Sequence, residues 1–310
     1  MRTTIKPNKL KFGDTIGVIA PSRPIYNIEK EIKLGIKILE SLGFNIKLSK
    51  NLYNHHFYSA GTAAERARDF NQMITDKEVS AIICATGGAS SAQILPLIDY
   101  GQLKMYPKII IGYSDNTALL LAINKKTGLV TFHGPDLSDL KNTSDSAIKY
   151  LMQLLTDLNK IPSLPNLKTI IKEGSADGRL IGGNIYLCNS ILASSFSPDY
   201  RQAIWFWEEV GASPAQLDQE LTQFKLSGNL EKITAIIIGN LSECQDKKYP
   251  QDNRAIKDII IDLTRNIDIP IVTVDFFGHD VKNFYTLPIG IRAIIDTDQN
   301  KLELLETAIK

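Results

Sequence analysis

Short apolar runs alternate with segments whose apolar residues recur at helical spacing through the first half of the chain. Strand-like runs lie at 15–20, 45–48, 80–84 and 108–111. Segments with apolar residues every three or four positions lie between and after them, at 28–42, 63–74 and 116–124. Strands that alternate with helices in this way form βαβ units. The first half is therefore predicted to be a parallel sheet covered by helices, a Rossmann-like or flavodoxin-like α/β domain.

The second half has a different pattern, with more strand-like runs and fewer helices. We expect strands at 169–172, 179–181, 203–207, 233–239 and 301–305, and helices at 185–193 and 256–263. A polar segment with two prolines, residues 159–167, follows a predicted helix near 146–158 and is typical of a linker. The chain is thus predicted to have two domains, an N-terminal α/β domain (1–158) and a smaller, mixed, β-rich domain (168–310).

Composition narrows the classes of function. The length of 310 residues fits about two domains. Lys plus Arg (35) nearly equals Asp plus Glu (34), so the net charge of +1 argues against a nucleic-acid-coating protein and against a polybasic membrane anchor. No apolar run approaches the roughly 20 residues that span a bilayer, and the basic N-terminus precedes no apolar run. We expect a cytoplasmic protein without membrane insertion or a nucleic-acid partner.

The stretch IIIGYSDNTA (109–118) is the most informative part of the chain. It places Ser114 between a buried strand and the start of a helix, where a hydroxyl is exposed at the carboxyl edge of the sheet. The helix N-terminus behind it favours developing negative charge. Asn116 stands where a G-x-S-x-G motif has its second glycine. Ser114 or Asp115 acting only as a helix cap explains the same residues, so nucleophile and cap are both open at this point.

A serine nucleophile needs a base, and the chain has four histidines: His55, His56, His133 and His279. The adjacent pair lies in an expected loop, with no carboxylate at a metal-ligand spacing. His133 follows a strand and could reach the same sheet edge as Ser114. His279 comes after an apolar run at 271–275 and next to a glycine that permits a tight turn. The pattern does not choose between His133 and His279.

Carboxylates and glycine pairs complete the candidates. Glu208 and Glu209 come directly after the apolar run at 203–207, where a carboxylate either orients a histidine or is a solvated strand end. The turns at Gly87–Gly88 and Gly182–Gly183 could present backbone amides to an anion or an oxyanion. Neither turn has the spacing of a phosphate loop or of a dinucleotide fingerprint, so we expect no cofactor.

Eight motifs, in order along nearly the whole chain, carry a resemblance to a known family. They are GDTIGVIAPS (13–22), TGGASSAQILPLIDY (86–100), GYSDNTALLLAI (112–123), GLVTFHGP (128–135), GRLIGGN (178–184), FWEEVG (206–211), LTQFKLSG (221–228) and FGHDVKNFYTLPIG (277–290). The ordered set resembles the LD-carboxypeptidases, serine peptidases that include the muramoyltetrapeptide carboxypeptidases and a branch of microcin-immunity peptidases.

The resemblance implies a role for particular residues. It makes Ser114 the nucleophile, His279 the base and Glu208 the acidic member of a triad. It further implies oxyanion donors at the main-chain amides of Gly88 and Asp115, and substrate contacts near Gly87 and Asn184. The implied reaction needs no metal and removes the terminal D-alanine from a peptidoglycan tetrapeptide. Family members are commonly homodimers, and a homodimer is expected here on that ground.

Some positions depart from the family pattern. Thr86 stands where many members have an arginine before the glycine pair. Gln216 and Gln219, in PAQLDQ (214–219), replace two arginines, and Ser194–Ser195 lies where a Gly-Thr pair is usual. These changes leave the triad complete but affect the region expected to recognise a substrate carboxylate.

Two other functions are consistent with the sequence. An immunity-type peptidase would cut a peptidyl-nucleotide amide and would need an aromatic side chain to stack on the base; the only tryptophans are Trp205 and Trp207, both within an expected strand. A non-enzymatic ligand-binding module of the periplasmic two-domain type is the more distant alternative. The complete Ser, Glu and His set and the lack of an expected signal peptide argue against it.

Overall fold

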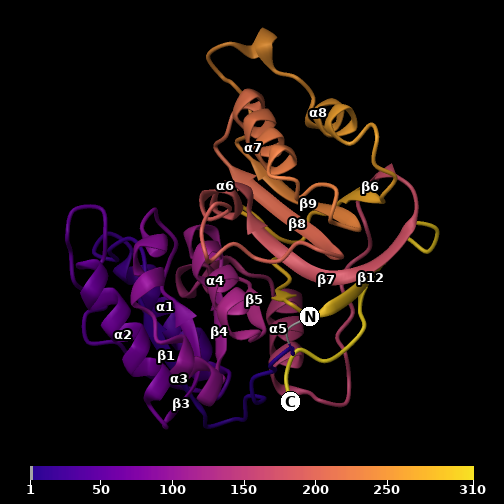
Figure 1. The fold of residues 1–310 in the computed structure, drawn as a ribbon. Coiled ribbons are helices and arrows are strands. Elements are labelled where there is room, and N and C mark those ends of the chain that lie inside the picture. Colours follow the sequence, from indigo (N-terminus) through magenta and orange to yellow (C-terminus); the bar gives the residue numbers. More distant parts are fainter. Residues whose placement is uncertain (1–2) are drawn as a thin grey trace.

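Two β-sheets organise the chain, and a computed structural model describes residues 3–310 (Figure 1). The first sheet has the strand order β11-β5-β4-β3-β1-β2. Its strands are β1 (Thr15–Ile19), β2 (Asn45–Leu48), β3 (Val79–Cys84), β4 (Ile109–Gly112), β5 (Thr131–His133) and β11 (Leu287–Ile289). The first five are parallel, and β11 runs antiparallel to β5. The parallel sheet predicted from the sequence is confirmed.

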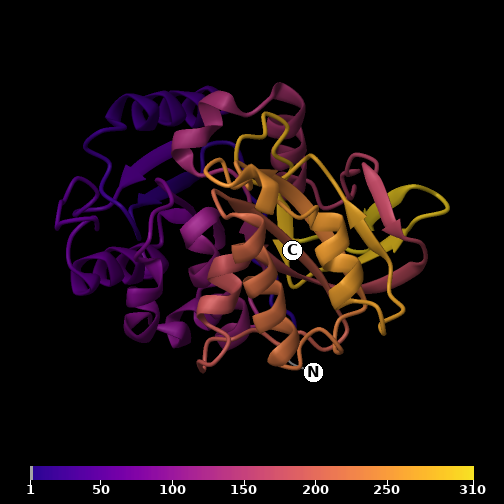
Figure 2. The same cartoon turned by 90° about the horizontal axis from the view of Figure 1, so that it is seen from above.

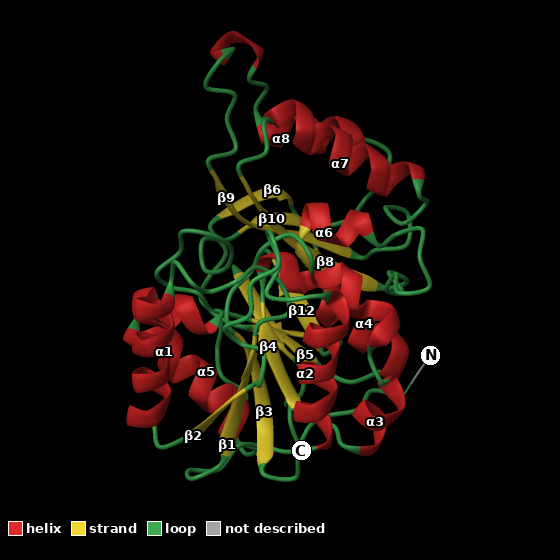
Figure 3. Ribbon diagram, turned by 90° about the vertical axis from the view of Figure 1, so that its left-hand side faces the viewer, coloured by secondary structure: helices red, strands yellow, loops and turns green. Residues whose placement is uncertain are grey.

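Helices cover both faces of the first sheet. Figure 3 shows α1 and α5 on one side of its strands and α2, α3 and α4 on the other. The helices are α1 (Glu29–Ser41), α2 (Ala63–Thr75), α3 (Tyr100–Met105), α4 (Thr117–Thr127) and α5 (Asp145–Thr156), with 3₁₀ turns η1 (Ser91–Leu97), η2 (Ser114–Asn116) and η3 (Leu137–Asn142). The parallel order β2-β1-β3-β4-β5 is that of a flavodoxin-like domain, in which ligands bind at the carboxyl ends of the strands beside β1 and β3.

Local sequence explains why these elements form where they do. The strands β3 and β4 are nearly continuous apolar runs because both of their faces are buried under helices. Helix α2 begins with a capping box, in which Thr62 and Glu65 satisfy each other's backbone amides. Helix α4 ends at Gly128, whose φ of +80° provides the left-handed cap that glycine adopts without steric cost.

The second sheet is mixed and has seven strands in the order β13-β12-β7-β8-β9-β10-β6. They are β6 (Thr169–Lys172), β7 (Ser175–Asn184), β8 (Ala203–Val210), β9 (Ala235–Ser242), β10 (Ile271–Thr273), β12 (Arg292–Asp296) and β13 (Lys301–Leu304). The central strands β7, β8, β9 and β10 are parallel, and the outer ones are antiparallel. The helices are α6 (Ile185–Ser190), α7 (Pro214–Leu226) and α8 (Ile256–Leu263), with the turn η4 (Pro250–Asp252). The predicted mixed, β-rich second part is confirmed.

Two features of the second half differ from the pattern-based expectation. The strand expected at 203–207 continues through Glu208 and Glu209, because both carboxylates are buried against polar partners instead of ending the strand in solvent. Helix α7 is not predicted by its weak periodicity. The sequence feature that marks this helix is at its N-terminus, where Pro214 follows Ser213 and a capping box joins Ser213 to Gln216.

The two halves of the sequence are interleaved. Seen from above, the indigo-to-magenta half and the orange part of the second half lie side by side (Figure 2). Strand β11, from the second half, pairs with β5 of the first sheet, and Lys310 exchanges backbone hydrogen bonds with Pro7 and Lys9. The segment 159–167 contains no helix or strand. The proposed division at this segment stays a prediction.

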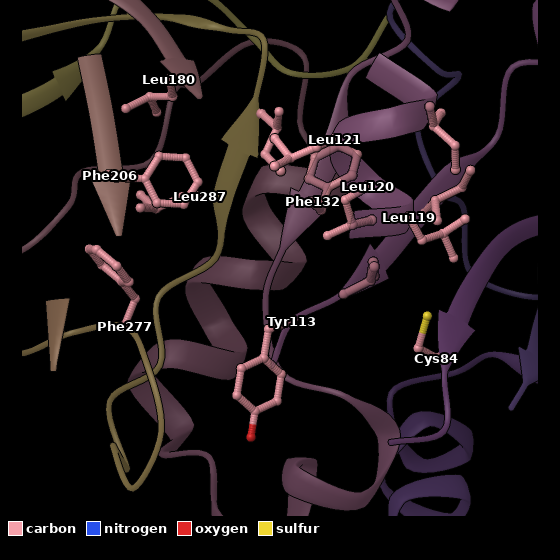
Figure 4. Close-up of a cluster of buried hydrophobic side chains, with 14 of the residues drawn as sticks. Cys84, Tyr113, Leu119, Leu120, Leu121, Phe132, Leu180, Phe206, Phe277 and Leu287 are labelled. Carbon is pink, nitrogen blue, oxygen red and sulfur yellow. The ribbon is translucent and has the colours of Figure 1, made fainter. Parts of the chain in front are cut away.

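A shared core joins the two sheets. Figure 4 shows side chains from both halves gathered in one cluster, among them Leu121, Phe132, Leu180, Phe206 and Leu287. Among residues 3–310, no helix is long and apolar enough to cross a membrane.

A tight contact between α4 and the end of β7 aligns the two sheets. Gly183 has a φ of +143°, and a Cβ there would lie 2.5 Å from the Thr117 methyl carbon. The next amide, of Asn184, donates a hydrogen bond to the Thr117 hydroxyl at 3.1 Å. Only glycine permits this approach, because it has neither a side chain nor a penalty at that φ.

We expect Gly183→Ala to lower the free energy of unfolding by about 1–3 kcal/mol, because the added methyl forces α4 away from β7. Urea unfolding measures the change. Gly211→Ala is the matched control, since Gly211 also has a positive φ (+76°) but no atom within 4 Å of an added Cβ. Equal destabilisation by the two substitutions would contradict a role for packing at Gly183.

Candidate active site

Ser114 occupies a strained turn at the carboxyl end of β4. Tyr113 before it is extended, Ser114 itself has a φ of +55°, and α4 follows after a single 3₁₀ turn. A left-handed conformation is unfavourable for a residue with a Cβ and persists only where the surroundings impose it. This turn leaves the Ser114 side chain half-buried at the sheet edge, at the N-terminal end of a helix. The geometry is that of a nucleophile elbow.

A chain of hydrogen bonds runs from Ser114 to a histidine and a carboxylate of the second half. The Ser114 Oγ lies 3.0 Å from His279 Nε2, and His279 Nδ1 lies 2.7 Å from Glu208 Oε2. The backbone amide of His279 donates to the same carboxylate oxygen at 3.2 Å. Because a carboxylate only accepts, Nδ1 carries the proton and Nε2 is left to accept from the serine hydroxyl.

Glu208 lies opposite an irregularity in β9. Trp207 pairs with Ile238 and Glu209 pairs with Leu241, so β9 has two residues, Gly239 and Asn240, where β8 has only Glu208. Gly278 makes room on the other side. It has a φ of +113°, and a Cβ there would lie 3.0 Å from the Cβ of Glu208. The Asn240 amide group holds the loop by donating to the His279 carbonyl oxygen at 2.6 Å.

Burial and pairing act in opposite directions on this pair. Burial alone raises the pKa of Glu208, which is fully buried, and lowers the pKa of His279. The hydrogen bond and the opposite charges outweigh burial, so the pKa of Glu208 falls below its usual range and that of His279 rises above 6.5. The arrangement therefore stabilises an imidazolium next to Ser114.

Tyr113 supports the imidazole from the side. Its ring centre lies 5.0 Å from that of His279 and 5.0 Å from that of Phe284. Its hydroxyl donates to Asp139 Oδ2 at 3.1 Å, and burial raises the pKa values of both Tyr113 and Asp139. The His279 ring is thus packed as well as hydrogen-bonded.

The Gly87–Gly88 turn faces the serine. A Cβ at Gly87 would lie 2.9 Å from Ser114 Oγ, and a Cβ at Gly88 would lie 2.2 Å from Ser22 Oγ. Gly88 also has a φ of +153°. Glycine is required at position 87 for the backbone to come this close to Ser114, and at position 88 for its φ and its contact with the 22–23 segment. A backbone this close to Ser114 is what main-chain amides need in order to bind an oxyanion.

The side chain of Asp115 ties three loops together, a role that the sequence analysis missed. Its Oδ2 accepts from the Ser22 hydroxyl at 2.5 Å and from the backbone amides of Ser90 and Ser91 at 2.9 and 2.7 Å. The Ser91 hydroxyl donates to the Asp115 carbonyl oxygen at 2.5 Å. The loops after β1 and β3 are thereby fixed to the turn that carries Ser114. The sequence signal for this role was the presence of serines shortly after β1 (Ser22) and after β3 (Ser90 and Ser91).

Asn184 and Glu209 form a second buried pair beside Glu208. Asn184 is 3% exposed and lies opposite Glu208 in the pairing of β7 with β8. Its amide group donates to Glu209 Oε1 at 3.0 Å, and its Oδ1 accepts from the Leu187 amide to cap α6. Burial raises the pKa of Glu209. Adjacent carboxylates on one strand thus have different partners, His279 for Glu208 and Asn184 for Glu209.

The other histidines lie outside this cluster. His133 is fully buried on β5 among the rings of Phe206, Phe277 and Phe284, with no hydrogen bond to either ring nitrogen within residues 3–310. Burial lowers its pKa to about 4, so it is neutral. His55 and His56 are on an exposed loop. In the described part of the chain no three His, Cys, Asp or Glu side chains are grouped so as to hold a metal ion.

Comparisons with known proteins agree with this architecture. Residues 16–134 match the model of the LD-carboxypeptidase N-terminal domain, and residues 177–295 match that of the LD-carboxypeptidase C-terminal domain. The probable murein peptide carboxypeptidase of Bacillus subtilis is 34% identical, over 98% of this chain and 95% of its own.

Two further relatives represent different activities. The microcin C7 self-immunity protein MccF of Escherichia coli is 30% identical over 96% of this chain and 94% of its own, and a solved MccF structure has a TM-score of 0.90, with 28% identity over 98% and 99% of the two chains. The muramoyltetrapeptide carboxypeptidase of Oxalobacter formigenes has a TM-score of 0.82, with 26% identity over 94% and 97%. With both domain models matched in order and the curated relatives aligned over nearly its whole length, the chain belongs to the LD-carboxypeptidase family of peptidases.

Proposed function

We propose that this chain is a serine LD-carboxypeptidase that releases the terminal D-alanine from peptidoglycan tetrapeptides. The observation that carries the proposal is the hydrogen-bond chain from Ser114 through His279 to Glu208, at 3.0 and 2.7 Å. The names of the Bacillus subtilis and Oxalobacter formigenes relatives support the substrate class.

In the proposed first step, His279 Nε2 takes the proton of Ser114 as Oγ attacks the carbonyl carbon before the terminal D-alanine. Glu208 stabilises the imidazolium that forms and keeps Nδ1 protonated. The main-chain amides of Gly88 and Asp115 donate to the oxyanion. His279 then gives its proton to the leaving amine, and an acyl-enzyme on Ser114 results.

In the second step, water attacks the acyl-enzyme while His279 again accepts a proton. His279 returns that proton to Ser114 Oγ as the acyl group leaves as a free acid, and the enzyme returns to its starting state. Gly87 and Asn184 line the proposed substrate side of this site, although Asn184 is itself engaged with Glu209. We further propose that the enzyme works on muropeptides in the cytoplasm and as a homodimer.

An immunity-type activity on peptidyl-nucleotides is the second candidate, supported by the likeness to MccF, which has been solved in complex with glutamyl sulfamoyl guanosine. Such a substrate needs an aromatic surface for its base. Trp205 and Trp207 do not provide one, because both are fully buried and Trp205 stacks on Phe224. The tryptophans therefore give this candidate no support, and the exposed ring of Tyr186, at the start of α6, is the aromatic side chain left to test for it.

We expect the wild type to remove one D-alanine from a purified disaccharide-tetrapeptide, and Ser114→Ala and His279→Ala to reduce turnover by about 10⁴-fold or more. Mass spectrometry of the products measures the reaction. Wild-type-like turnover by Ser114→Ala would refute the triad. Cleavage of a peptidyl-nucleotide but not of the tetrapeptide would favour the second candidate.

The two neighbouring carboxylates should differ in their effect on turnover. We expect Glu208→Gln to lower kcat by about 10³- to 10⁴-fold, because the amide cannot hold the required tautomer of His279. Glu209→Gln, the matched control, keeps a side chain able to form a hydrogen bond with Asn184 and should lower kcat less than tenfold. The reverse order in kcat measurements would assign the triad position to Glu209.

The pKa of His279 offers a test that does not depend on turnover. In Ser114→Ala, NMR titration should find His279 titrating above 6.5, because Glu208 favours the charged imidazole. Adding Glu208→Gln removes that influence and leaves burial, so the pKa should fall. His133 should stay neutral down to about pH 4 in both proteins. An unchanged His279 pKa would mean that Glu208 does not stabilise the imidazolium.

A further inference from the structure

Arg23 lies directly beside the turn that faces the nucleophile. Its backbone amide donates to the Gly87 carbonyl oxygen at 3.3 Å. A Cβ at Gly88 would lie 2.9 Å from the Cβ of Arg23, while a Cβ at Gly87 would lie 2.9 Å from Ser114 Oγ. The same two-residue turn therefore has Ser114 against one glycine and Arg23 against the next.

The guanidinium of Arg23 is held in place by a neutral group. Its Nε and Nη2 donate to Thr86 Oγ1 at 3.2 and 2.9 Å, and Thr86 is buried. Two of the five N–H donors of the guanidinium are used in this way. Arg23 is exposed and forms no ion pair with any carboxylate of residues 3–310. By contrast, Arg201 and Arg292 are each paired with an aspartate.

This arrangement leaves an oriented positive charge beside the turn that faces Ser114. A hydroxyl fixes the direction of the guanidinium but does not neutralise it, so its remaining donors are free to meet an anion. Planar guanidinium donors match the two oxygens of a carboxylate better than any other side chain does. Positions 216 and 219 of α7 offer no such cation, since both are glutamines, and the Gln216 side-chain oxygen accepts from the Ser213 amide.

We propose that Arg23 binds the free terminal carboxylate of the substrate and so restricts the enzyme to the last residue of a peptide. The assignment rests on the proposed carboxypeptidase function. In such a substrate the carboxylate is one residue beyond the carbonyl that Ser114 attacks. On the protein, Thr86, which holds the guanidinium, directly precedes Gly87, which faces Ser114. The cation and the nucleophile therefore lie against the same short segment, residues 86–88.

The test compares a tetrapeptide with its C-terminal amide, using wild type, Arg23→Gln and Arg23→Lys. We expect Arg23→Gln to lower kcat/KM for the free acid by about 10- to 100-fold, mainly through KM, and to leave the amide unchanged. The kcat/KM of Arg23→Lys for the free acid should lie between those of wild type and Arg23→Gln, because lysine keeps the charge but loses the paired donors. Arg68→Gln, at an exposed arginine of α2, is the control and should leave the preference for acid over amide unchanged.

The possible outcomes distinguish failure of the role proposed for Arg23 from failure of the proposed function. An equal loss for acid and amide would mean that Arg23 acts on the protein's own carboxylates and would overturn the inference. The carboxylates concerned are Asp139 and the buried Asp136, on both of which the charge of Arg23 acts to lower the pKa. Unchanged kinetics in Arg23→Gln would overturn it while the proposed function stands. If the wild type cuts neither peptide, the proposed function fails and the inference fails with it.

Discussion

The arrangement of the site depends on the buried carboxylate of Glu208. A carboxylate with no exposed surface is costly unless a partner compensates for it. Here the partner is His279, which offers both its amide and its Nδ1 proton to one oxygen. A bulge in β9 lies opposite Glu208, and the positive φ of Gly278 lets the histidine loop approach. The imidazole can then present only Nε2 outward, toward Ser114.

Neither half of the chain makes this arrangement alone. The first sheet supplies Ser114 on a strained turn, and the Asp115 carboxylate fixes the neighbouring loops around it. The second half supplies Glu208 from strand β8 and His279 from the loop that follows β10. Their alignment depends on the close contact between Thr117 and Gly183 and on β11, which carries the second half of the chain into the first sheet. A small shift between the sheets would open the 3.0 Å contact between Ser114 and His279.

Local pattern was enough for much of the fold. The apolar runs and helical spacings identified the parallel strands and most of the helices, and the strand-to-helix turn singled out Ser114. The pattern could not choose between His133 and His279, because that choice depends on contacts between residues 165 positions apart. The structure surrounds His133 with aromatic rings and places His279 between Ser114 and Glu208.

Other features lay beyond local pattern for the same reason. The pairing of β11 with β5, the bulge opposite Glu208 and the loops tied by Asp115 all join distant segments. The strand containing Glu208 was expected to end before it, since a charged residue usually marks a solvated end. A buried partner from another part of the chain reverses that expectation, and only the fold reveals the partner.

The most direct test of the account is to trap the acyl-enzyme. An activated ester analogue, in which an aryl leaving group replaces the terminal D-alanine, makes deacylation the slow step, and acid quenching followed by peptide mapping locates the acyl group. We expect a single acyl group on Ser114 that forms rapidly in wild type and much more slowly in His279→Ala. An acyl group on another residue, or equally fast labelling of Ser114 without His279, would contradict it.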